Sequence, residues 1–169
     1  GERRDFMAPA ADATAIKPHH FVDILTSLGQ GHPSLDPHPY GHALHKVTRE
    51  LLADRDATLC IELGADDICL PCRHNVKGLC DDVIDTSYRP LAPKSKREWN
   101  LIIDQRWCAV LGIGQGDRIA AREMCRRILD CLDEIDGIYR EIPADRNARR
   151  RSGLEKGALE FLGSQGTQC

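Results

Sequence analysis

The sequence predicts a mainly α fold, with α+β as the alternative: a helical single domain with one short strand or hairpin and a cysteine-rich metal-binding loop. Three observations support this prediction. Apolar residues recur at helical spacing in several segments, most clearly between residues 118 and 141. Residues 58–63, T-L-C-I-E-L, have the alternation of a short strand. The 169 residues match the size of one domain.

Five segments are expected to be helical. The first covers residues 17–29, because Pro18 stands at its start and Gly29 at its end. A loop rich in proline and histidine leads to a second helix over residues 40–54. The remaining helices are expected over 96–111, 118–141 and 145–162, with a glycine turn at 112–117 and Pro143 after the fourth helix. In the 118–141 helix, one apolar stripe holds Ala121, Cys125, Ile128, Leu132, Ile135 and Tyr139.

The composition excludes several classes of protein. The net charge of −3 argues against a general binder of nucleic acid, and no apolar run approaches the ~18 residues of a membrane span. The first residues lack the apolar core of a secretory signal, so we expect a cytoplasmic protein. The run R-N-A-R-R-R-S at 146–152 is expected to be a solvated helix face, with an anionic partner or phosphate group as the alternative.

Seven of the eight cysteines fall into two groups. Four are expected to have no ligand role: Cys125 and Cys131 on the apolar surface of the long helix, Cys60 in the strand and Cys169 in a polar tail. Cys69, Cys72 and Cys80 differ, because they lie in a loop rich in Asp, Pro, Asn and Gly. In a reducing compartment metal ligation is favoured over disulfides, and pairing would leave one of these three thiols over.

The spacing of these thiols limits the choice of metal. A C-x-x-C step lets two sulfurs converge on one centre, and three thiolates suit zinc or an iron–sulfur cluster. A structural zinc ion needs a fourth ligand, and the chain has no second C-x-x-C. His74 follows Cys72 too closely for a relaxed tetrahedral site. A [4Fe–4S] cluster is therefore favoured, with zinc as the alternative.

Residues 66–80, D-D-I-C-L-P-C-R-H-N-V-K-G-L-C, resemble a segment of a family of small proteins described as predicted iron–sulfur binders. That family also has a His-His pair near its start, here His19–His20, and an L-G-L-x-x-G-D turn, here Leu111–Asp117. Asp104 looks like a further family position. The resemblance covers residues 17 to about 130. From the composition and helix pattern together with this match, we expect a flexible leader over residues 1–16, an iron–sulfur-binding domain over 17–142 and a C-terminal helical extension and tail over 143–169.

One departure from the family pattern concerns the fourth ligand. The family commonly has a cysteine shortly after the His-His pair, where this chain has Asp23. Either Cys108 completes the ligand set, or the fourth iron position is open or held by Asp23, a histidine or a substrate. Cys108 lies roughly 160° around its helix from the centre of the Trp99–Val110 apolar stripe. A buried thiol remains the simpler interpretation of this residue.

The other polar candidates are histidines and aspartates. His19, His20 and Asp23 are the catalytic candidates, because imidazole and carboxylate groups can move protons beside a metal. Asp66 and Asp67 are expected to form a turn or to orient the cofactor's ligands. A loose group of four histidines is expected to be a surface feature: His32, His38, His42 and His45.

Three hypotheses of function follow. An open iron could act as a Lewis acid on a small-molecule substrate, which would make the protein an iron–sulfur-dependent lyase or hydrolase. Alternatively, four protein ligands would suit electron transfer or redox sensing with a redox partner protein. The third hypothesis is a zinc-stabilised binding module. We expect no nucleic-acid or membrane partner.

Overall fold

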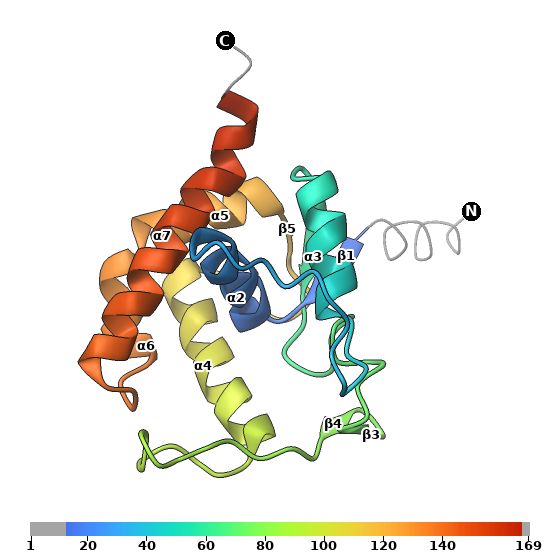
Figure 1. Cartoon of the computed structure of the whole chain (residues 1–169), viewed down its shortest axis with the longest axis vertical. Coiled ribbons are helices and arrows are strands. Elements are labelled where there is room, and N and C mark those ends of the chain that lie inside the picture. Colours follow the sequence, from blue (N-terminus) through green and yellow to red (C-terminus); the bar gives the residue numbers. More distant parts are fainter. Residues whose placement is uncertain (1–12, 167–169) are drawn as a thin grey trace.

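The computed structural model describes residues 13–166, in which helices predominate and short strands join them into one domain (Figure 1). The helices are α2 (Pro18–Gly29), α3 (Leu44–Ala53), α4 (Lys96–Leu111), α5 (Ala121–Asp130), α6 (Ile135–Ile138) and α7 (Ala144–Gly166), with a 3₁₀ turn at Leu132–Glu134. The strands are β1 (Ala13–Ile16), β2 (Thr58–Ile61), β3 (Asn75–Val76), β4 (Leu79–Cys80) and β5 (Arg118–Ala120). The prediction of a mainly α fold with α+β character is confirmed. Among these helices none has the length and apolar character needed to span a membrane.

Of the strands in residues 13–166, the sequence prediction found β2 but missed β1, β5 and the two short strands of the cysteine loop, β3 and β4. β1 pairs in parallel with β2, Ala13 opposite Thr58 and Ile16 opposite Ile61, and β5 pairs antiparallel with the other edge of β2. Residues 13–16 were expected in a flexible leader, so that boundary was wrong for these four residues. Residues 1–12 lie outside the described residues. A strand of four residues becomes recognisable only through its partner, which here is more than 40 positions away along the chain.

The helix predicted over residues 118–141 is divided in the structure. Residues 118–120 form β5, and α5 ends where Cys131 adopts φ −119° and ψ 18°, before the 3₁₀ turn and α6. All six residues of the predicted apolar stripe are nonetheless buried. The apolar spacing therefore predicted burial correctly, although tertiary contacts broke the helix that would have produced that spacing.

Helix α4 follows its prediction over 96–111. The side chain of Ser95 accepts a hydrogen bond from the backbone N–H of Glu98 at 3.2 Å, which caps the first turn. Gly112 ends the helix in the left-handed region, at φ 70°. These two signals fix both ends of the helix, so its bounds could be predicted from local sequence.

Helix α7 packs against α2 through glycines. A Cβ atom added to Gly157 would stand 1.6 Å from the carbonyl oxygen of Leu25, and one added to Gly29 would stand 1.9 Å from that of Gly153. The two backbones approach this closely only because glycine has no side chain. Leu154, Ala158 and Phe161 of α7 are fully buried. The segment predicted as a C-terminal extension therefore belongs to the core of the same domain.

Candidate metal centre

A tight hairpin brings Cys80 back toward the C-x-x-C step. β3 and β4 are joined by Lys77 and Gly78, which both have positive φ values, 53° and 85°. Two such residues define the hairpin turn that matches the twist of its strands. Asn75 lies opposite Cys80 in the register, and the N–H of Cys72 donates to the carbonyl of Cys69 at 2.9 Å. The local fold thus gathers three thiols that span twelve positions.

Asp66 organises the backbone around these cysteines. It is fully buried, and its carboxylate accepts hydrogen bonds from the N–H groups of Lys17, at 2.7 Å, and Cys69, at 2.9 Å. It also lies 2.7 Å from Nδ1 of His20. Although burial opposes ionisation, these neighbours hold the pKa of Asp66 far below its usual range. A charged Asp66 therefore ties the start of α2 to the cysteine loop.

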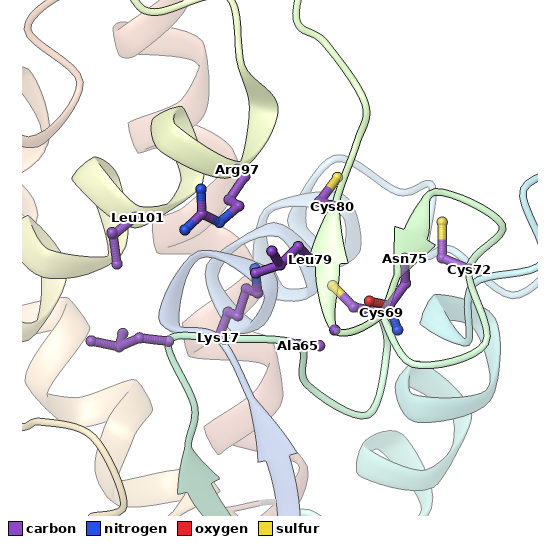
Figure 2. Close-up of a pocket in the computed structure, with 12 residues that line it drawn as sticks. Lys17, Ala65, Cys69, Cys72, Asn75, Leu79, Cys80, Arg97 and Leu101 are labelled. Carbon is purple, nitrogen blue, oxygen red and sulfur yellow. The ribbon is translucent and has the colours of Figure 1, made fainter.

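The three thiols line one cavity of about 190 Å³, shown in Figure 2. Each of the three cysteines is half-buried, and none forms a disulfide. The cavity is also lined by the side chains of Lys17, at the start of α2, and Arg97, in α4. Lys17 is only 6% exposed, and no carboxylate of residues 13–166 lies within ion-pair distance of its ammonium group. The cavity thus combines soft ligands with an unneutralised positive charge.

Cys69 also belongs to a smaller group suited to a single ion. One ring nitrogen of His20, one carboxylate oxygen of Asp66 and Sγ of Cys69 lie within 4.8 Å of one another, and no other such group occurs among the described residues. Burial first, and the charge of Asp66 second, raise the pKa of the Cys69 thiol to about 12. A metal bound here must displace that proton, so metal binding at Cys69 would release it.

The two adjacent histidines have different surroundings. His19 is buried, and its Nδ1 lies 2.9 Å from the fully buried carboxylate of Asp104. Burial alone lowers the pKa of His19, but the contact with Asp104 outweighs it and raises that pKa overall. The ring of His20 lies 4.3 Å from that of His19, between centroids, and contacts Asp66 instead. His20 therefore faces the cysteine loop, whereas His19 contacts Asp104 of α4.

Asp23 and Cys108, the candidates for the fourth ligand, are not among the residues that line the cysteine cavity. Asp23 forms an ion pair with Arg150 of α7 at 3.1 Å. Cys108 is 8% exposed and lies seven positions beyond Leu101, the last α4 residue to border the cavity, which is about 10 Å along the helix axis. Its thiol pKa is raised to about 11, mainly by burial. These features fit a packed thiol.

Asp67 and the remaining histidines serve local structure. Asp67 accepts a hydrogen bond from the N–H of Ala15 at 3.0 Å and so fixes β1, rather than facing the cysteines. His38 and His42 stack with their ring centroids 4.5 Å apart, which fits the predicted surface group. His32 and His38 are exposed, while His42 and His45 are half-buried. Cys125 is fully buried, as predicted, and Cys131 and Cys60 are half-buried.

Three contributors to the site were missed from sequence. Lys17 and Arg97 carry no motif, and only the fold brings them to the cysteines. Asn75 also lines the cavity, and its side-chain oxygen is buried without a hydrogen-bond partner. The C-x-x-C-x-x-N spacing places Asn75 three positions beyond Cys72, and it could have drawn attention to Asn75 because polar groups around a metal site orient its ligands.

Comparison with known proteins adds no further assignment. No protein-family model matches the chain, and neither a curated protein nor a solved structure matches it.

Proposed function

We propose that this protein binds a metal centre at the cysteine cavity, and that the centre is an iron–sulfur cluster of the [4Fe–4S] type held by Cys69, Cys72 and Cys80. The observation that carries the proposal is that all three thiols, which span twelve positions of the sequence, border one cavity beside a buried cation. Thiolate-bound clusters carry negative charge, which the neighbouring Lys17 and Arg97 would stabilise.

The polar groups of the cavity support this choice of cofactor. Lys17 is 6% exposed, and a positive charge is costly to bury without a counter-charge. A bound anionic centre would offer Lys17 the counter-charge that the described residues lack. The backbone N–H groups of the hairpin could then donate hydrogen bonds to the negatively charged sulfurs of the centre. Such surrounding groups tune the redox potential of a cluster.

His20 is the candidate side chain for the fourth position, in place of Asp23 or Cys108. Its ring lies against Asp66, which orients the imidazole and fixes which nitrogen carries the proton. An iron with an exchangeable ligand acts as a Lewis acid toward oxygen or sulfur groups of a small substrate. If a substrate took that position instead of His20, the free imidazole would hold or move a proton, while Asp66, with its carboxylate already saturated by hydrogen bonds, would keep the ring in place.

Zinc is the second candidate, because one observation favours it. His20, Asp66 and Cys69 present three donor types within 4.8 Å of one another, which is the spacing of ligands around a single ion. Cys72 could complete such a set through the C-x-x-C turn. The metal would then be structural, and the protein would be a binding module.

Anaerobic purification of the full chain, followed by the visible spectrum and the iron, sulfide and zinc contents, tests the proposal. We expect a brown protein with about four irons and four sulfides per chain. A colourless protein with one zinc ion would refute the iron–sulfur assignment and support the second candidate.

Four variants identify the ligands. Cys69→Ala and Cys80→Ala should each lose the cluster, while Cys60→Ala is the matched control, since Cys60 is equally half-buried but lies in β2. Cys108→Ala should retain iron and sulfide in full. Cluster loss in Cys108→Ala would instead indicate four cysteine ligands and favour an electron-transfer protein.

A further inference from the structure

A second candidate site lies beside His19. This histidine borders a cavity that is lined by arginines and contains no cysteine. This cavity has a volume of about 180 Å³ and adjoins a groove of about 460 Å³, with Asp23 and Arg150 lining both. Together we call them the basic pocket. Its polar lining includes His19, Arg89, Lys96, Asn100, Arg146 and Arg150.

Two segments that are distant in the sequence supply the arginines of the basic pocket. Arg89 comes from the loop between β4 and α4, which Figure 1 shows running below the start of α7, and Arg146 and Arg150 come from α7. The guanidinium of Arg146 lies 3.7 Å from the centroid of the Tyr88 ring, and that of Arg89 lies 4.8 Å from the same ring. One aromatic ring thus holds two arginines beside each other.

The carboxylates nearby do not neutralise these arginines. Asp23 is engaged by Arg150 at 3.1 Å, and Asp82 by Lys96 at 3.2 Å. Neither Arg89 nor Arg146 has a carboxylate within 4.0 Å anywhere in residues 13–166. The pKa of Arg89 is lowered by burial and, to a smaller extent, by the positive charges of Arg150 and Arg146. Asp85 offsets part of that repulsion, but it is fully exposed and accepts from the N–H of Ser87.

An amide side chain also lines the pocket. Asn100 is 6% exposed and lines the smaller cavity, and its side chain makes no hydrogen bond within the described residues. An NH₂ group beside unneutralised guanidinium groups is a donor set that complements a planar or tetrahedral oxyanion.

We propose that the basic pocket binds a small molecule through a carboxylate or phosphate group, held by Arg89 and Arg146 with Asn100 as a further donor. The inference goes beyond the metal proposal and is independent of it, because none of these side chains lines the cysteine cavity. Arginine suits this role since its fork of donors matches the two oxygens of such groups. The Arg150–Asp23 pair sets the far wall of the pocket and holds α7 in register with α2.

Titration calorimetry on the full chain as purified tests the proposal, with inorganic phosphate and acetate as separate probes at constant ionic strength in chloride. We expect saturable binding of at least one probe, and the tighter of the two assigns the ligand class. Arg146→Gln, at an exposed position, and Arg89→Gln should each weaken binding about tenfold. Asp23→Asn should strengthen it, because Arg150 would lose its competing carboxylate.

Arg151→Gln is the matched control. Arg151 lies on the same helix and has the same charge, but it pairs with Asp133 and lines neither cavity. The affinity of the Arg151→Gln variant for the probe should stay within about twofold of that of the wild type, because salt screens the effect of an exposed charge at a distance. Absence of saturable binding by either probe would overturn the proposal. Equal weakening in Arg151→Gln and Arg146→Gln would also overturn it, since the attraction would then come from general charge.

Discussion

Gly157→Ala should destabilise the protein far more than a single methyl group usually does. The added Cβ would lie 1.6 Å from the carbonyl oxygen of Leu25 and 2.6 Å from its carbonyl carbon, both in the backbone of α2. Ordinary contact begins at 3.4 Å, so the helices would have to separate by about 1.8 Å at this point. No rotamer change can relieve the clash, because neither atom belongs to a flexible side chain.

The size of the effect follows from two opposing contributions. Alanine favours the helical backbone by about 1 kcal/mol relative to glycine. Against this, separating α2 from α7 loosens the contacts of the fully buried Leu154 and Phe161, and overpacking or lost packing at such sites costs about 3–5 kcal/mol. We therefore expect a net loss of about 3 kcal/mol. For a chain of this length that loss lowers the melting temperature by roughly 6–12 °C.

Urea unfolding followed by circular dichroism measures this loss, with each variant in the same metal-loading state as the wild type. Gly163→Ala is the matched control: it lies in the same helix, and an added Cβ there meets nothing within 4 Å. It should leave stability unchanged or raise it by up to about 1 kcal/mol. If Gly157→Ala unfolds at the same urea concentration as Gly163→Ala, the close α2–α7 contact is refuted.

Three further predictions concern other parts of the molecule. Glu141→Gln should cost about 1 kcal/mol at pH 7, because Arg106 donates two hydrogen bonds of 2.8 Å to this half-buried carboxylate. The hydrogen bonds from Arg106 lower the pKa of Glu141, so this stabilisation is present above the unfolded-state pKa and is lost as the pH falls through the lowered folded-state pKa, which parallel urea titrations would show. Ser95→Ala removes the cap on the Glu98 N–H and should cost about 1 kcal/mol in thermal unfolding, while Ser95→Thr should retain most of the stability. Gly78→Ala forces a side chain into φ 85° at a strain of about 1–3 kcal/mol, and metal analysis should show reduced occupancy because the turn that returns Cys80 is weakened.

Local signals in the sequence predicted the elements that local chemistry determines. Pro18 and Gly29 bound α2 correctly, and Ser95 with Gly112 bound α4, because caps act on the backbone beside them. The cysteine loop was recognised for the same reason, since three thiols on a non-periodic segment have few structural roles. Their role as metal ligands stays a prediction.

The features that sequence analysis missed depend on contacts between residues far apart in the chain. β1 and β5 are too short to be identified without β2, which pairs with both. The different surroundings of the two histidines depend on distant residues. His19 contacts Asp104, which is 85 positions away, and His20 contacts Asp66, which is 46 positions away. Lys17 and Arg97 came to the cysteines only through the packing of α2 and α4. Pairings at such separations leave no periodic trace in the residues themselves.

The glycine contact between α2 and α7 also sets an order of events during synthesis. α2 is the first described helix and α7 the last, with Gly29 and Gly157 about 130 positions apart. At typical translation rates, the apolar face of α2 would wait roughly 6–25 s on the ribosome before its partner is made. The nascent chain therefore exposes the side of α2 that α7 will cover, and a holdase that shields Phe21 and Leu25 would matter most in that interval.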